Sequence, residues 1–314
     1  MGGRPIEAHE MRSYYSERSY VSSATNATQV FKEREMWEKF DPSKMKLPRE
    51  ARDSVASPHS RGIILSEDIT GSLGSFLLSL IKNEFPRLIT QIYDSVPYDP
   101  HIMFMGIGDV AEGDKAPLQV TQFETDLKML EQLEKIYLEQ GGGSNSYESY
   151  ILSWYFAAKH IKMDCWEKRK EKGFLFTFGD EEPTPRLTDW DIKKVFGSQD
   201  ELVGRVITAE DCFEAVSEKF YCYHIILHGN GYDSDVVRKW RNLMGSKVCD
   251  LSDHSFIPEL VTTILRMHEG LNKSDALNRI QNSKAKSIVE SALRWHEENI
   301  ISPIDSIEHN IEVF

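Results

Sequence analysis

From Gly62 onward, short apolar runs of strand length alternate along the chain with amphipathic segments of helix length. Six runs have the character of buried strands: residues 62–68, 101–109, 117–123, 173–180, 221–229 and 247–251. Helical patterns lie between or after them, at residues 74–94, 126–140, 147–171, 209–220, 234–245 and 255–268. Strands that alternate with helices of this length form βαβ units. The alternation therefore predicts an α/β fold with a doubly wound, mostly parallel, six-stranded sheet flanked by helices.

The same pattern divides the chain into three regions. Residues 1–58 are polar and aperiodic, and we expect an extended N-terminal arm that the core does not need for folding. Residues 59–270 make up the predicted α/β domain. Residues 271–314 continue as a C-terminal helical extension that packs outside it.

The balance of charge argues against nucleic acid as a ligand. The 314 residues include 37 Lys and Arg against 50 Asp and Glu, a formal charge of −13, whereas proteins that neutralise phosphates present basic surfaces. The four cysteines are scattered, without the spacing of a zinc site or a disulfide framework. No apolar run approaches the roughly 18 residues of a membrane span, and no leader pattern is apparent. We therefore expect a cytoplasmic protein that binds neither nucleic acid nor membrane.

The end of the first predicted strand carries one acid and two hydroxyls at every second position: Asp68, Thr70 and Ser72. Ligands of doubly wound sheets bind outside the carboxyl ends of the strands, and Asp180 follows the fourth strand at that edge. Carboxylates and hydroxyls are the hard oxygen donors that Mg²⁺ prefers. The pattern predicts a divalent-cation site. Thr70 and Ser72 are also good N-cap residues, so simple capping of the next helix is the alternative interpretation.

The stretch Asp68-Ile69-Thr70-Gly71-Ser72 resembles the Asp-x-Ser-x-Ser motif that begins the metal-ion-dependent adhesion site of von Willebrand factor A (vWA) domains, which have a Rossmann-like fold. In that family a Gly-rich second loop adds a hydroxyl ligand, and a third loop adds an Asp. Residues 141–146 and FTFGDEEP, which contains Asp180, are the candidates here. More narrowly, the three loops look like those of a group of bacterial and phage vWA proteins.

The resemblance implies a protein that binds one divalent cation, Mg²⁺ or else Mn²⁺ or Ca²⁺, and uses it to recognise an Asp or Glu of a partner protein. The implied metal ligands are Asp68, Thr70, Ser72, Asp180 and, from the second loop, Ser144 or Asn145. Ser146, which competes with these two, Glu181 and Glu182 are expected to face the partner, and either Glu could instead fill the open coordination position. No nucleophile–base pair remains once Asp68 is assigned to the metal, so we expect no enzymatic activity.

Two interpretations of other classes stay open. The Asp68–Leu73 stretch also resembles the first motif of haloacid-dehalogenase (HAD-like) phosphohydrolases, in which Asp68 would be the nucleophile and Gly179-Asp180 an acidic Mg²⁺ motif. Most such phosphatases carry a general acid two residues after the nucleophile, where this chain has Thr70. In the third interpretation the protein is a structural or assembly component with an incidental metal, and residues 1–58 make its contacts.

Two histidines, His224 and His228, have the same-face spacing of a strand in YCYHIILHG. The sequence shows no acidic or cysteine partner for either of them. We therefore expect core or edge histidines rather than ligands.

Overall fold

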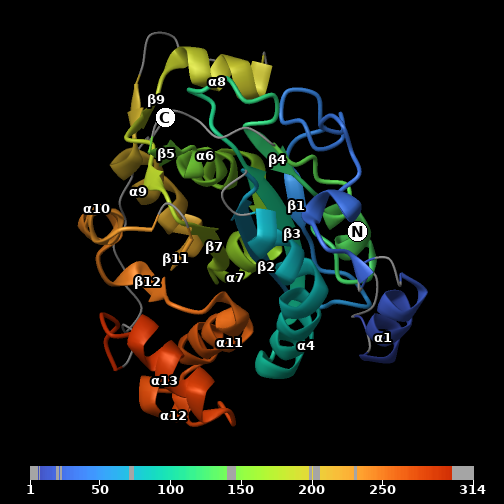
Figure 1. Ribbon diagram of the computed structural model, residues 1–314, viewed down its shortest axis with the longest axis vertical. Helices are drawn as coiled ribbons and strands as arrows, with labels where there is room; N and C mark the ends of the chain where they lie inside the picture. Colours follow the sequence, from blue (N-terminus) through green and yellow to red (C-terminus); the bar gives the residue numbers. More distant parts are fainter. Residues whose placement is uncertain are drawn as a thin grey trace.

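The central sheet of the computed structural model contains six strands, in the order β12-β11-β7-β2-β3-β4 (Figure 1). The structure describes residues 6, 8–18, 21, 23–70, 74–139, 146–197, 200, 206–229 and 232–298. The strands are β2 (Ser60–Asp68), β3 (Asp99–Ile107), β4 (Leu118–Val120), β7 (Gly173–Gly179), β11 (Phe220–Leu227) and β12 (Val248–Leu251). β4 runs antiparallel to β3, and the other pairs in this sheet are parallel. The predicted α/β fold with a mostly parallel, six-stranded, Rossmann-like sheet is thus confirmed.

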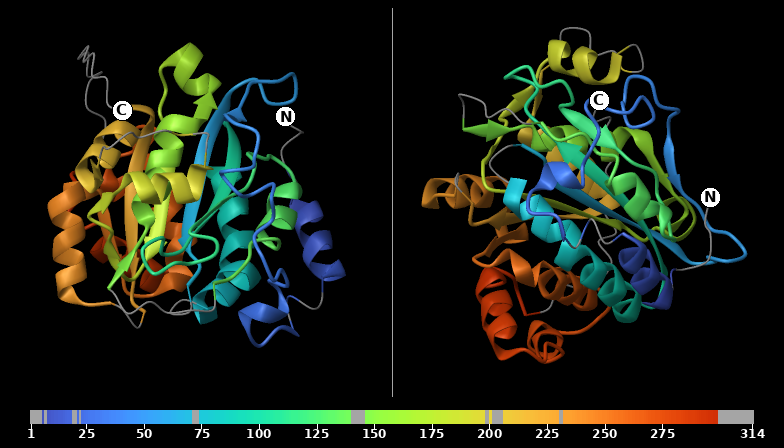
Figure 2. Two further views of the ribbon diagram at one scale, coloured as in Figure 1. Left: turned by 90° about the horizontal axis from the view of Figure 1, so that it is seen from above. Right: turned by 45° about the vertical axis from the view of Figure 1, so that its right-hand side comes forward.

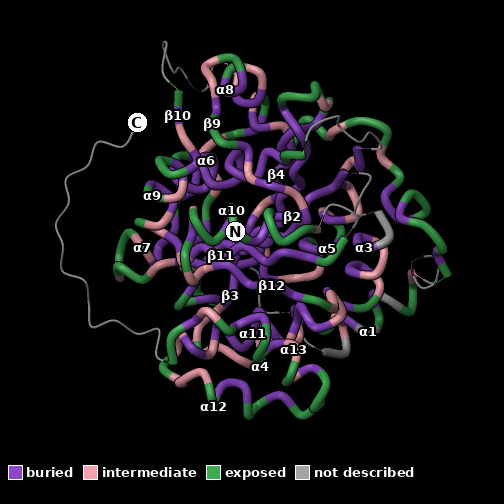
Figure 3. The backbone as a smooth tube through the Cα atoms, turned by 60° about the vertical axis from the view of Figure 1, so that its left-hand side comes forward, coloured by how far each residue is buried: buried purple, intermediate pink, exposed green. Residues whose placement is uncertain are grey.

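The strands of this sheet are buried on both faces, as near-continuous apolar runs in parallel sheets usually are. All nine residues of β2 are buried (Figure 3). Alternation along β2 directs Ile63 and Leu65 to one face of the sheet and Ile64 to the other. Ile64 lies between Met103 of β3 and Leu175 of β7 in the register of the sheet.

Helices cover both faces of the sheet (Figure 2). On one face pack α4 (Phe85–Ser95), α11 (Ile257–His268) and α13 (Ser283–Ala292). On the other face pack α6 (Tyr150–His160), α9 (Ala209–Lys219) and α10 (Ser234–Met244). Capping boxes begin α9, at Thr208, and α8 (Asp189–Phe196), at Thr188. In each, the Thr hydroxyl oxygen accepts a hydrogen bond from the backbone N–H of the third helical residue, an Asp, and the carboxylate of that Asp accepts one from the Thr backbone N–H.

Shorter elements complete the chain. They are α1 (Ala8–Glu17), η1 (Ala27–Gln29), β1 (Arg49–Ala51), α3 (Gly74–Ser79), η3 (Leu80–Glu84), α5 (Lys128–Leu133), β5 (Tyr147–Glu148), β6 (Ile161–Met163), α7 (Asp164–Arg169), β8 (Glu182–Pro183), α8 (Asp189–Phe196), β9 (Arg186–Leu187), β10 (Ile207–Thr208), η5 (Gly245–Lys247), η6 (His254–Phe256) and α12 (Lys273–Leu277). The helices α12 and α13 lie within residues 271–314, and α13 packs against β12 and α11.

The N-terminal region differs from the extended arm expected for residues 1–58. Met11, Tyr14, Val30 and Phe31 are buried in the core on the α4 face of the sheet. Met11 and Tyr14 lie three residues apart on α1, whereas Val30 and Phe31 follow η1 in irregular backbone. Sequence periodicity could not reveal these contacts.

A related difference concerns the helix predicted over residues 147–171. The structure divides it into α6 and α7, which are separated by β6. β6 pairs in parallel with β1, with Arg49 opposite Ile161 and Ala51 opposite Met163. The backbone of residues 161–163 therefore pairs with β1 instead of continuing the helix.

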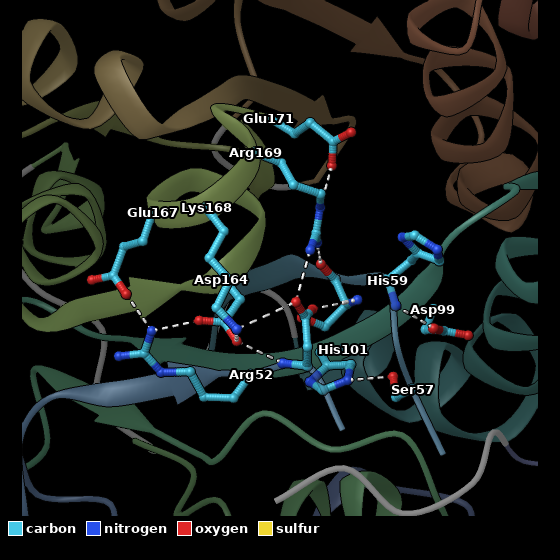
Figure 4. Close-up of polar contacts among 12 residues, drawn as sticks. Arg52, Ser57, His59, Asp99, His101, Asp164, Glu167, Lys168, Arg169 and Glu171 are labelled. Carbon is cyan, nitrogen blue, oxygen red and sulfur yellow. Dashed lines mark hydrogen bonds and ion pairs between the residues drawn. The ribbon is translucent and has the colours of Figure 1, made fainter. Parts of the chain in front are cut away.

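Ion pairs fix the segment before β2 to α7 at the amino end of the sheet (Figure 4). Asp53 accepts hydrogen bonds from Ser60 and pairs with Arg169 Nη1 at 2.8 Å. Arg52 Nη1 pairs with Asp164 Oδ1 at 2.8 Å. Burial opposes ionisation of Asp164, but hydrogen bonds from Lys168 and Arg52 outweigh it and lower the pKa of Asp164 to about 2. These contacts fasten the N-terminal region to the α/β domain.

Candidate functional site

The strand order places the ends of β2 and β7 at the position where a doubly wound sheet binds its ligands. β2 and β7 are neighbours, and the chain proceeds from β2 toward β3 on one side and from β7 toward β11 on the other. Such a reversal opens a crevice at the carboxyl ends of the two strands. Asp68 ends β2 and Asp180 follows β7, so the structure brings these two predicted residues to one edge. Both side chains are fully buried.

The Asp68 carboxylate lies between the first loop and α6. Its Oδ1 accepts hydrogen bonds from the Thr70 amide at 2.8 Å and the Thr70 hydroxyl at 2.7 Å. Its Oδ2 accepts one from the Tyr150 hydroxyl at 3.2 Å. Burial raises the pKa of Asp68 to about 7; the hydrogen bonds from Thr70 oppose this shift, and the charge of Asp180 adds to it. Asp180 is therefore near enough to act on Asp68 electrostatically.

Tyr150 connects the first loop to the third. Its hydroxyl oxygen accepts a hydrogen bond from the Glu181 amide at 3.4 Å, in addition to donating to Asp68. A Cβ on Gly179 would lie 1.9 Å from this hydroxyl oxygen. Only glycine at residue 179 leaves room for the link. Tyr150 was not among the residues expected from the sequence, because its helix contains several aromatic residues with the character of core side chains.

Gly229, which follows β11, allows a second close approach. A Cβ at this position would lie 2.3 Å from Asp180 Oδ2. The chain after β11 thus packs directly against the Asp180 carboxylate.

Substituting Gly229 by alanine is expected to displace the Asp180 carboxylate and to weaken binding of Mg²⁺ at this edge by about tenfold or more, which corresponds to roughly 1.4 kcal/mol. Isothermal titration calorimetry with Mg²⁺ measures the effect. Gly113→Ala is the control for general strain, because the positive φ of 87° at Gly113 makes the substitution unfavourable while no atom lies within 4 Å of the place that a Cβ would occupy. Equal Mg²⁺ affinity in both variants would contradict a role for Asp180 in the site.

The second predicted loop reaches the site through its last residues. Ser72, Ser144 and Asn145, three of the expected ligands, lie outside the described residues. Ser146 is exposed, and its carbonyl oxygen accepts a hydrogen bond from the Glu182 amide at 3.1 Å. β5 then pairs in parallel with β8, so the end of the second loop runs beside the third.

Glu148 is an acid of this site that the sequence did not single out. Its side chain is buried, and within the described residues its Oε2 has no hydrogen-bond partner. Burial raises the pKa of Glu148 to about 10, and the charges of Asp68 and Asp109 add to the shift. Burial raises the pKa of Tyr150, and the charges of Asp68, Glu148 and Asp180 add to this shift. An acid just ahead of a buried helix, as in YESYIL, is the signal that could have identified it.

The two acids after Asp180 have different surroundings. Glu182 is buried and forms an ion pair with Lys239 of α10, so its carboxylate is already engaged. Glu181 is half-buried. Burial raises the pKa of Glu181, and the charges of Asp180 and Glu182 add to the shift. Of the two, Glu181 has the carboxylate without an ion-pair partner among the described residues.

The donor set fits a hard divalent cation. Two buried carboxylates and the Thr70 hydroxyl lie together, and no described Lys, Arg or His forms an ion pair with Asp68. Within the described ranges, no cluster of three or more His, Cys, Asp and Glu has the arrangement of a metal site. Asp68, Glu148 and Asp180 are therefore not placed as three ligands of one ion, and the predicted set requires only two of these carboxylates, with hydroxyl or amide oxygens as the other ligands.

His224 is a core histidine, as expected. It is fully buried, stacks on Trp240 with ring centroids 3.5 Å apart, and has Nδ1 2.8 Å from the Thr177 hydroxyl oxygen. Burial lowers the pKa of His224 well below its usual value. It therefore stays neutral and serves packing.

Fold and site together define an α/β protein with an acidic site at the switch point of a Rossmann-like sheet. No protein-family model matches the sequence, and no curated protein matches it. Among solved structures, the chain is similar to the pilus adhesin SpaC from Lactobacillus rhamnosus GG, with a TM-score of 0.42 and 8% identity over 77% of this chain. The similarity spans 32% of the adhesin chain. In the part of the chain that the structure describes, no helix has the length and apolar character needed to cross a membrane.

Proposed function

We propose that this protein is a vWA-like binding protein that holds a divalent cation, Mg²⁺ in the first place, and recognises an Asp or Glu of a partner protein through it. One observation carries the proposal. Asp68 and Asp180, from loops far apart in the sequence, are both fully buried and lie close enough for one to raise the pKa of the other. Burying two like charges together is costly, and that cost is relieved either by a proton on one of the acids or by a cation that joins them.

Asp68, Thr70 and Asp180 are the described residues that would hold the cation, with Ser72 and either Ser144 or Asn145 as the remaining candidates. When bound, Mg²⁺ would supply a positive centre that attracts a further carboxylate. Glu181 would compete with the partner for that centre, whereas the pairing of Glu182 with Lys239 argues against such a role for Glu182.

A binding role is also favoured over phosphoryl transfer. Both oxygens of Asp68 accept hydrogen bonds, from Thr70 and from Tyr150, which lowers the nucleophilicity of this carboxylate. Thr70 stands where a general acid would be needed. We therefore propose that the protein is not an enzyme. The same proposal includes the vWA-like resemblance, a cytoplasmic location and the absence of nucleic-acid and membrane partners.

The test is direct binding of Mg²⁺ and Mn²⁺ to the full chain, measured by calorimetry. Wild type is expected to bind both ions, and Asp68→Ala and Asp180→Ala to bind them at least tenfold more weakly. Glu290→Ala is the matched control, because it removes one acid from an exposed position on α13 and should leave the affinity unchanged.

Equal affinity of wild type and Asp68→Ala would contradict the cation site and favour the assembly-component interpretation. Mg²⁺-dependent release of phosphate from p-nitrophenyl phosphate would instead favour the phosphohydrolase, provided that a phosphoenzyme on Asp68 can be trapped in acid.

A further inference from the structure

The backbone of Glu181, the residue after Asp180, is held from two sides. The indole Nε1–H of Trp240 in α10 donates a hydrogen bond to the Glu181 carbonyl oxygen at 2.9 Å. The Glu181 amide donates to the Tyr150 hydroxyl oxygen at 3.4 Å, and this hydroxyl donates to Asp68 Oδ2 at 3.2 Å. A chain of three hydrogen bonds therefore runs from α10 through the third loop to the first loop.

Aromatic contacts fix the orientation of the Trp240 indole. The indole is fully buried and stacks on the His224 imidazole, with ring centroids 3.5 Å apart and 11° between the ring planes. The rings of Tyr150 and Trp154 lie edge to face with it, at centroid distances of 5.3 and 5.8 Å. Aromatic pairs of this geometry attract one another, and together they limit rotation of the indole. The Nε1–H is therefore held in the direction of the Glu181 carbonyl.

The preceding residue of α10 holds the same loop by a side chain. Lys239 forms an ion pair with Glu182, whose amide donates a hydrogen bond to the Ser146 carbonyl oxygen at 3.1 Å. α10 lies beside β11 and β12 (Figure 1) and also contacts β8. Two consecutive residues of α10 thus hold the two residues that follow Asp180, while β7 holds the chain before it. The placement of the Asp180 carboxylate depends on both.

We propose that Trp240 is a positioning residue of the candidate cation site: its hydrogen bond to the Glu181 carbonyl fixes the third loop so that Asp180 meets the first loop at Asp68. The inference rests on the proposed function, which places a divalent cation between these two acids. Mg²⁺ demands near-octahedral geometry, so a displaced carboxylate lowers the affinity. Trp240 acts through the backbone of Glu181 and not on the cation itself. Because such coupling is reciprocal, binding of the cation changes the surroundings of the indole.

The test compares Trp240→Phe with Trp154→Phe in the full chain, by calorimetry with Mg²⁺. Both substitutions shorten a fully buried indole of the same aromatic cluster. Trp240→Phe also removes the donor to Glu181, whereas Trp154 Nε1 has no hydrogen-bond partner among the described residues. We expect Trp240→Phe to bind Mg²⁺ about fivefold more weakly than wild type, as the loss of one hydrogen bond typically allows. Trp154→Phe should bind Mg²⁺ like wild type, although both variants should melt at lower temperature.

The indole ¹⁵N–¹H NMR signals of the wild-type chain give a second readout, which a role of Trp240 in packing alone would not move. The Trp240 signal, assigned through its contacts with His224 and Tyr150, is expected to shift as Mg²⁺ is added and to saturate together with the calorimetric titration. The signal of Trp190, an exposed residue of α8, should stay unchanged. This measurement requires no variant, so it decides the matter if Trp240→Phe fails to fold.

Two failures can be told apart. If wild type binds no Mg²⁺, the proposed function fails and this inference with it. If wild type binds Mg²⁺ but Trp240→Phe and Trp154→Phe bind it equally well, or the Trp240 signal does not respond to Mg²⁺, the positioning role of Trp240 alone is overturned.

Discussion

A chain that begins at residue 59 is expected to lose cooperative folding. The truncation removes a set of buried apolar side chains from both faces of the sheet, namely Met11, Tyr14, Val21, Ala24, Ala27, Val30, Phe31, Phe40, Met45 and Ala51. Burying one large apolar side chain contributes about 1.5–3 kcal/mol, and the free energy of unfolding of a domain is typically only about 5–15 kcal/mol. The loss is thus comparable to the whole stability. It would also remove the pairing of β1 with β6.

Thermal unfolding followed by near-ultraviolet circular dichroism tests this expectation, since a molten chain loses the near-ultraviolet signal. Phe31→Ala is the point-variant counterpart within the full chain, and we expect it to lower the free energy of unfolding by about 3–5 kcal/mol. Glu33→Ala, at a half-buried position of the same segment, should have a much smaller effect. A truncated protein that unfolds cooperatively at the wild-type temperature would show that residues 1–58 are the dispensable arm that the sequence suggested.

Asp68→Asn is expected to stabilise the protein at pH 7.5 in the absence of divalent cations. Burial raises the pKa of Asp68 from 3.8 to about 7 in the folded protein. Between these two values the folded state keeps the proton and the unfolded state releases it, so rising pH favours unfolding. The loss of stability is roughly 1.4 kcal/mol for each pH unit in this window. Asparagine is neutral throughout and avoids this loss.

Urea unfolding of both proteins in EDTA, from about pH 4 to about pH 8, measures the difference. The wild-type stability should fall relative to that of Asp68→Asn as the pH rises through the window, and remain constant relative to it above the folded-state pKa.

Asp164→Asn provides a control of opposite sign. The pKa of Asp164 is lowered to about 2, so its stabilising contribution is present above the unfolded-state pKa and lost on acidification, and Asp164→Asn should be less stable than wild type at neutral pH. Parallel pH profiles for wild type and Asp68→Asn would contradict the buried acid pair.

Some residues of the site could be predicted from the sequence and others could not. Asp68 and Asp180 follow long apolar strands, and the carboxyl ends of neighbouring parallel strands lie at one edge, so their meeting could be predicted. Glu148, Tyr150, Gly179 and Gly229 could not, because their importance depends on close approaches between segments distant in the sequence. The same is true of the His228–Asp250 pair, which joins two neighbouring strands.

Hydrophobic periodicity was sufficient to predict the α/β class, the six strands of the sheet and the edge at which the acids gather, because this period is a local property that each segment carries alone. Only the folded chain shows that part of residues 1–58 packs into the core. The same is true of the short strand β6, which divides the helix predicted over residues 147–171. The orientation of His228 by Asp250 belongs with them. Each of these depends on a partner segment whose surface and hydrogen-bonding groups exist only once the sheet and its helices have come together, and no local pattern encodes such a partner.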